Sequence, residues 1–199
     1  MSINNLRKLL NDADQDTVLA GQSWYSNAKN EAFILASKYS TYIEVTASVI
    51  AALSPRNKWE WNLQDADNVL SHVFINTPLK KCTTFTFNVN KAIKLCDENL
   101  SHIERLSILN GIKVKSFYLN ILGIDTAVTI DTWIDLAFSG KYKKMKKRKN
   151  LTLTRYKKIE NIFFKLGQEY QMKPYALQAI VWLQFQKMIG VKKYASKNI

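Results

Sequence analysis

Two lysines and one carboxylate lie where they could act on a nucleic acid. Lys113 and Lys115 follow the Asn110-Gly111 dipeptide, which is typical of a turn, and they open a stretch of helical periodicity. A helix N-terminus has unpaired backbone N–H groups that favour negative charge, so lysines placed there can bind a phosphate. Asp131 follows at the predicted start of the next helix. The pattern therefore predicts a cation and a carboxylate on neighbouring elements.

The positions of these lysines depend on a predicted helix-turn-helix unit at about residues 101–123. Ser101 and Glu104 have the spacing of a capping box, and the helix that they start is expected to end at the Asn110-Gly111 turn. Gly123 lies where a left-handed cap would end the second helix. The expected apolar positions are Ile103, Leu106 and Leu109 in the first helix, and Val114, Phe117, Tyr118 and Ile121 in the second.

Most of the remaining chain is also predicted to be helical. Residues 1–20 are expected to form a short, polar and partly amphipathic arm with Leu6, Leu9 and Leu10 as its apolar side. Residues 77–90 lose helical periodicity, and their CTTFTFN segment alternates like a strand or an extended loop. The other predicted helices are 24–39, 43–53 (buried and central), 55–70, 91–99, 131–140, 152–170 and 174–189.

These stretches resemble the helix-hairpin-helix (HhH-GPD) DNA glycosylase superfamily. Its hairpin has the form LPGVGxK and precedes a VDT segment followed by His or Trp. The matching stretches here are 109–115 and 131–133, with Asn110 in place of the common Pro and Lys113 in place of the second Gly. Residues 52–62, ALSPRNKWEWN, resemble the family's LSxQ helix start. The resemblance implies an all-α fold in which residues 1–199 form one domain, with the site between two helical lobes and the N- and C-terminal helices in the second lobe.

The resemblance assigns the chemistry to Asp131 and Lys115. Excision of a base breaks the C1′–N bond through a cation-like sugar. A carboxylate can stabilise this cation or orient the attacking water. Asp131 matches the family's catalytic aspartate, and the alternative role of a helix N-cap is compatible with catalysis. Lys115 matches the lysine that attacks C1′ and forms a Schiff base in members with AP-lyase activity. A phosphate contact is the alternative role of Lys115, and Lys113 is the alternative nucleophile.

A base pocket is predicted after the 43–53 helix. Ser54 and Pro55 suit the N-cap and first position of a following helix. Polar and aromatic side chains near this start could accept a flipped base, with Asn57 contacting its edge and an indole stacking on it. Core packing is the alternative role of the tryptophans. The predicted pocket residues are Ser54, Arg56, Asn57, Trp59, Trp61 and Trp133.

The charge indicates a polyanionic partner. Twenty-nine Lys and Arg against 16 Asp and Glu give a net charge of +13, which is typical of nucleic-acid binders, although a lysine-rich genome would also raise it. A basic run at residues 141–149 is either a solvated loop or a contact to the DNA backbone. The expected partner is double-stranded DNA bound by a monomer. The predicted backbone contacts are Gly111, Lys113, Lys143, Lys144, Lys146 and Lys147.

No cofactor is expected. Cys82 and Cys96 lack the spacing of a zinc or iron–sulfur site, so no metal is predicted, and the four-cysteine loop of several glycosylases is missing from this sequence. The sequence has neither a signal-peptide pattern at its start nor ~18 consecutive apolar residues. A cytoplasmic location without a membrane partner is therefore predicted.

The resemblance to this superfamily implies a DNA N-glycosylase that excises a modified base and leaves an abasic site. The SPRNxWxxN and VTIDTW segments resemble a branch associated with phages and bacterial defence. That branch implies an antiviral role and a bulky phage-type target such as glucosylated 5-hydroxymethylcytosine. The alternatives are a non-catalytic DNA-binding module and an enzyme that alters a hypermodified base without excising it. P-loop and Rossmann glycine patterns are absent.

Overall fold

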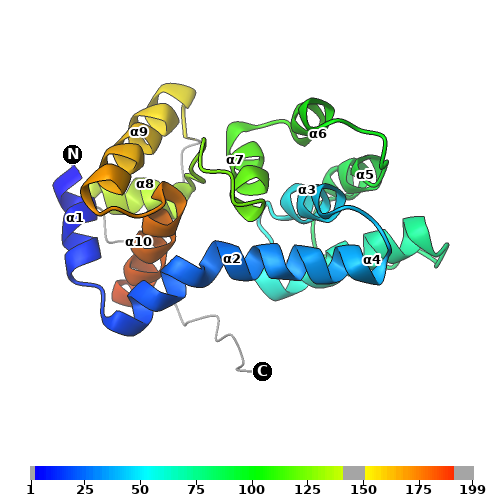
Figure 1. The fold of residues 1–199 in the computed structure, drawn as a ribbon, viewed down its shortest axis with the longest axis horizontal. Coiled ribbons are helices and arrows are strands. Elements are labelled where there is room, and N and C mark those ends of the chain that lie inside the picture. The colour runs from blue at the N-terminus through cyan, green and yellow to red at the C-terminus, as the bar shows by residue number, and fades with distance from the viewer. Residues whose placement is uncertain (1–2, 141–150, 191–199) are drawn as a thin grey trace. The chain divides into compact units, whose positions relative to one another are not determined.

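The computed structural model describes residues 3–140 and 151–190, and these residues form ten helices and no strand (Figure 1). The predicted all-α class is confirmed, whereas the glycosylase-like arrangement of the helices stays a prediction. The helices are α1 (Ile3–Asn11), α2 (Gln15–Lys38), α3 (Ile43–Leu53), α4 (Trp59–Phe74), α5 (Thr86–Leu95), α6 (His102–Leu109), α7 (Ile112–Ile121), α8 (Thr132–Ser139), α9 (Leu153–Glu169) and α10 (Pro174–Met188).

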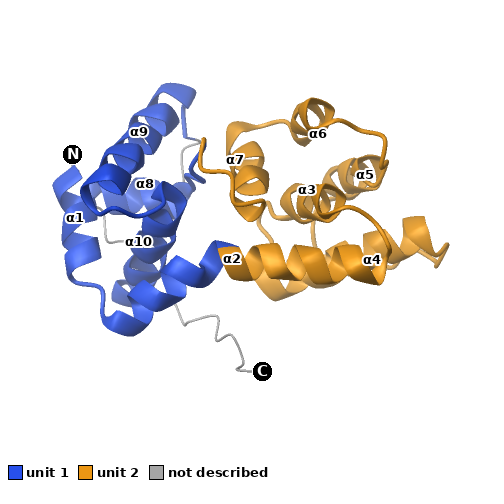
Figure 2. Ribbon diagram, viewed as in Figure 1, with its two compact units in different colours: residues 1–25, 127–199 blue, residues 26–126 orange. Residues whose placement is uncertain are grey.

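The chain divides into two compact units (Figure 2). Unit 1 contains residues 1–25 and 127–199, and unit 2 contains residues 26–126. No helix in the described ranges combines the length and the apolarity that a bilayer crossing requires.

Unit 2 is built around α3. Every residue from Val45 to Leu53 is buried, and α3 packs against α4, α5, α6 and α7. A helix that is apolar on all sides must be covered by others, so the IEVTASVIAAL run forms the centre of this unit. The predicted buried central helix is confirmed.

The predicted helix-turn-helix unit is present as α6 and α7. The capping box forms, since the Ser101 side chain accepts from the Glu104 N–H while the Glu104 carboxylate accepts from the Ser101 N–H at 2.8 Å. Asn110 and Gly111 both have positive φ, 45° and 90°, which produces the sharp turn. Gly123, with φ 82°, ends the segment after α7 as predicted.

The apolar side predicted for α6 is partly wrong. Ile103 is 78% exposed, whereas Arg105 is 2% exposed. The Arg105 guanidinium donates to the Leu95 carbonyl at 2.5 Å and to the Asp97 carbonyl at 2.7 Å. Because it satisfies carbonyls at and beyond the C-terminus of α5, a charged side chain occupies an inward position of α6.

The helix start predicted at Ser54 and Pro55 is wrong. Ser54 and Pro55 do not start a helix: the Ser54 hydroxyl donates back to the Ala51 carbonyl at 2.9 Å, and α4 begins only at Trp59. Arg56 has φ 59°, which interrupts helical geometry between α3 and α4.

The predicted strand or extended loop at 77–90 is also partly wrong, because α5 already starts at Thr86. The preceding loop is held by side chains of α4. The Asn68 side chain bonds both the N–H and the carbonyl of Lys80, and the Asp65 carboxylate accepts from the Thr83 N–H at 3.0 Å. These polar side chains satisfy backbone groups that a strand partner would otherwise satisfy.

Unit 1 uses both ends of the chain. The apolar side predicted for the N-terminal segment is confirmed, since Leu6, Leu9 and Leu10 are buried. The segment is not an arm, because α1 packs against α8 and α10. Gly21 lies inside α2, where a Cβ would come within 2.4 Å of the Ile180 side chain and 2.6 Å of its backbone nitrogen. Only glycine allows α2 and α10 to approach this closely.

Candidate functional site

Asp131 is fixed at the N-cap of α8 by two neutral donors. Its Oδ1 accepts from the Ile134 N–H at 2.9 Å, and its Oδ2 accepts from Trp182 Nε1 at 3.2 Å. The side chain is half-buried. The predicted N-cap is therefore confirmed, and the same contacts hold the carboxylate in one orientation.

The segment that delivers Asp131 is clamped by α9. Residues 127–130 are buried and belong to no helix or strand. The Tyr156 hydroxyl donates to the Val128 carbonyl at 2.8 Å and accepts from the Ile130 N–H at 3.1 Å. One turn further along α9, the buried Glu160 carboxylate accepts from the Val128 N–H at 3.1 Å. The position of Asp131 thus depends on α9.

The aromatic pair Trp24 and Tyr25 lies beside the donor indole of Trp182. Trp24 meets Trp182 edge-on with ring centroids 6.3 Å apart, and it meets Tyr25 at 4.7 Å. The Tyr25 hydroxyl donates to Gln178 at 3.0 Å. Burial raises the pKa of Tyr25 well above its usual value, and the nearby negative charge of Asp131 adds to this rise. Tyr25 therefore stays a neutral donor at physiological pH.

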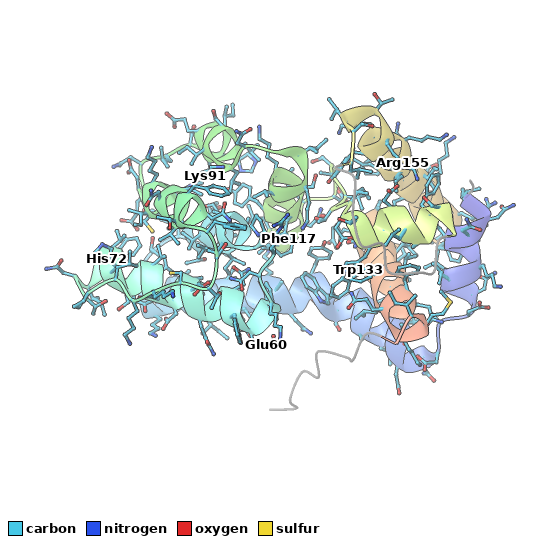
Figure 3. All side chains as sticks on the ribbon, turned by 180° about the vertical axis from the view of Figure 1, so that it is seen from behind. Glu60, His72, Lys91, Phe117, Trp133 and Arg155 are labelled. Carbon is cyan, nitrogen blue, oxygen red and sulfur yellow. The ribbon has the colours of Figure 1, made fainter. Side chains whose placement is uncertain are left out.

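The second carboxylate of α8 is paired differently. Asp135 forms an ion pair with Arg155, the residue of α9 labelled in Figure 3, and Arg155 also donates to the Ser139 hydroxyl at 2.6 Å. The pair links α8 to α9, so Asp135 has a structural partner of opposite charge. Asp131 instead takes its two hydrogen bonds from a backbone amide and an indole, which leaves its charge without a cationic partner among these contacts.

The predicted cations lie in the other unit. Lys113 and Lys115 belong to the first turns of α7, both half-buried, and the Lys115 N–H donates to the Gly111 carbonyl at 3.1 Å. α7 is part of unit 2, whereas Asp131 is part of unit 1. The basic run, including Lys143, Lys144, Lys146 and Lys147, lies outside the described residues.

Unit 2 has a cavity of about 470 Å³ beside the hairpin turn. Arg56, Asn110 and Val114 line it together with Phe85, the N-cap of α5, and Phe87 and Lys91 of α5. Arg56 was predicted as a pocket residue. The two phenylalanines and Lys91 were missed. The alternating TFTF segment carried a signal for the phenylalanines, whereas no pattern pointed to Lys91.

The other predicted pocket residues are not among those lining this cavity. The Asn57 amide donates to Asp65 at 2.9 Å and accepts from the Thr83 hydroxyl at 2.9 Å, which ties α4 to the following loop. Trp59 packs edge-on against Phe117 at 6.4 Å.

Two predicted tryptophans have other surroundings, and Ser54 caps α3 as described above. Trp61 is 48% exposed, with the Lys58 ammonium 5.4 Å from the centre of its ring. Trp133, labelled in Figure 3, follows Asp131 in unit 1. Its ring centroid lies 6.4 Å from that of Phe185. Within residues 3–140 and 151–190, no group of three or more His, Cys, Asp or Glu residues could hold a metal ion.

These features define a helical protein with a preorganised carboxylate in one unit and a turn-flanked cavity in the other. The chain belongs to a family of unknown function, DUF7178, whose model matches residues 2–188. No curated protein and no solved structure matches the chain.

Proposed function

We propose that this protein is a DNA N-glycosylase that excises a modified base and leaves an abasic site. The observation that carries the proposal is the carboxylate of Asp131, held by two neutral donors at the start of α8. Each carboxylate oxygen can accept more than one hydrogen bond. The group can therefore orient a water for attack, or face the developing sugar cation, without first reorganising.

DNA is the proposed substrate. The net charge of +13 favours a polyanion, and the Asn110-Gly111 turn places Lys113 and Lys115 in the first turns of α7, where backbone N–H groups and cations favour a phosphate. Lys115 is the proposed nucleophile if the enzyme also cleaves the strand, and a phosphate contact if it does not. The proposed target is a bulky phage-type base such as glucosylated 5-hydroxymethylcytosine, with antiviral defence as the setting.

The test is to incubate the protein with normal, damaged and phage-modified DNA duplexes, and to measure released base by mass spectrometry and abasic sites by alkaline cleavage. The expected result is a free base from one class of substrate. Asp131→Asn should slow release by about 10²–10³-fold. Asp135→Asn is the matched control, because it neutralises a carboxylate on the same helix that is paired with Arg155.

Two results would reject the proposal. DNA binding without base release from any substrate would identify a binding module. A chemically altered base that stays attached to the DNA would identify an enzyme that modifies bases without excising them.

A further inference from the structure

The cavity of unit 2 contains a stack of two aromatic rings between two cations. The rings of Phe85 and Phe87 are stacked at 13°, with centroids 5.6 Å apart. The Arg56 guanidinium lies 5.8 Å from the centre of the Phe85 ring, and the Lys91 ammonium lies 5.6 Å from that of Phe87 (Figure 3 labels Lys91 on α5). One small surface therefore offers both π faces and positive charge.

This stack is exposed beside a partly buried cavity wall. Phe85 is 46% and Phe87 is 58% exposed, whereas Leu109 on the cavity wall is 1% exposed. Large aromatic side chains left open beside a cavity are typical of a binding surface. Arg56 also has φ 59°, a conformation that is uncommon for residues other than glycine and that often occurs at functional positions.

The chemistry of the stack defines the class of ligand. A flat aromatic group gains from stacking on phenylalanine and arginine, and an anionic group gains from Arg56 and Lys91. Asn110 adds an amide at the cavity wall. A volume of about 470 Å³ is in the range that accepts a small ligand, roughly 300–1,000 Å³. A nucleotide combines the flat ring and the negative charge.

We infer that this cavity binds an unpaired nucleotide of a DNA strand. Arg56 and Lys91 turn from the ring faces to pair with the adjacent phosphates, and the base stacks on Phe85 or Phe87 in place of one of them. A base inside a duplex is covered on both faces, so the site selects unpaired DNA. The inference goes beyond the proposed function: it needs DNA as the partner but no chemistry at Asp131.

The first experiment compares the affinity for a labelled single-stranded oligothymidylate with that for a duplex of equal length, by fluorescence anisotropy. The Phe85→Ala/Phe87→Ala protein should lose about tenfold or more in single-strand affinity, the scale of one stacked base, and much less in duplex affinity. Phe33→Ala is the matched control, because Phe33 is a 59% exposed phenylalanine of α2 in the same unit, and its single-strand affinity should stay within about twofold of wild type.

Two lysine variants test how much positive charge contributes to single-strand binding. Lys91→Gln should weaken single-strand binding and reduce its salt dependence, because one phosphate contact is lost. Lys94→Gln makes the same change on an exposed position of α5 that is not among the cavity-lining residues, and it should have little effect. Photocrosslinking to an oligonucleotide that contains 5-iododeoxyuridine should modify the peptide with Phe85 and Phe87.

Three results would overturn the inference. They are unchanged single-strand affinity in the folded Phe85→Ala/Phe87→Ala protein, equal losses on single strand and duplex, and equal affinity for free thymidine monophosphate and the oligonucleotide. If the alanine protein does not fold, Phe85→Leu/Phe87→Leu keeps apolar bulk and removes only the rings, so the same comparison applies. Phenylalanine-dependent single-strand binding without base release would reject the proposed function and support this inference.

Discussion

Replacing Asp131 with asparagine separates the charge of the N-cap from its shape. Asparagine and aspartate are about equally good N-caps, so α8 should still form. The amide has only one acceptor oxygen, however, while two donors face this side chain, the Ile134 N–H and Trp182 Nε1. In either orientation of the amide, one of these donors faces the NH₂ group.

The expected loss of stability follows from these contacts. A buried donor left without an acceptor costs about 1–3 kcal/mol, and losing a negative charge at a helix N-terminus costs about 0.3–1 kcal/mol. Because Trp182 is only half-buried, the unfolding free energy should fall by about 1–3 kcal/mol. For a chain of this size, each kcal/mol lowers the melting temperature by roughly 2–4 °C.

Trp182→Phe supplies the control for this mismatch. It removes the indole donor and keeps the Asp131 charge. The Asp131→Asn/Trp182→Phe protein should be more stable than the sum of the single effects predicts, by about 0.5–3 kcal/mol, because the donor conflict disappears. Denaturant unfolding of the four proteins measures this coupling.

The rate of base release under single-turnover conditions then measures how much the Asp131 charge contributes to catalysis. Asp131→Asn should slow release by about 10²–10³-fold, the scale of one preorganised electrostatic group, and the double variant should not recover it. Trp182→Phe should lose less than about tenfold, since the carboxylate and its N-cap bond remain. The reasoning is refuted if folded Asp131→Asn is fully active, or if Trp182→Phe is as slow as Asp131→Asn.

Three further predictions concern other parts of the chain. Borohydride should trap wild type on its DNA substrate but not Lys115→Gln if Lys115 is the nucleophile; no trapped wild type would mark Lys115 as a phosphate contact. Burial raises the pKa of Tyr118 to about 12. The folded state therefore holds this proton more tightly than the unfolded state, and the stability that Tyr118 contributes should fall between about pH 10 and 12 by at most about 1.4 kcal/mol per unit. Denaturant unfolding of Tyr118→Phe should show a weaker alkaline decline than wild type; an identical decline contradicts the assignment. Neutralising the four lysines of the basic run should weaken DNA binding in a salt-dependent way with little change in melting temperature, whereas unchanged binding would make the run a solvated loop.

Local signals in the sequence were sufficient for much of the secondary structure. The capping pair Ser101 and Glu104, the Asn110-Gly111 turn, and Asp131 before α8 were all predicted at the correct positions. Each depends on interactions within a few residues, such as a side chain that accepts from an N–H three positions ahead. The buried α3 was equally clear, because its run has no polar face to expose.

Only the tertiary structure determined the partners of these residues. Trp182 and α9 hold Asp131 and its segment, although they come later in the chain. Arg56 lies over the Phe85 ring, although the whole of α4 separates the two residues in the sequence. Arg105 is buried against the end of α5, and its position in α6 and its charge predicted neither its burial nor this contact. Periodicity indicates which face of a helix is buried, but hydrogen bonds and ring contacts between distant segments depend on which faces meet. Which faces meet depends on the packing of the whole unit, so no local sequence pattern predicts it.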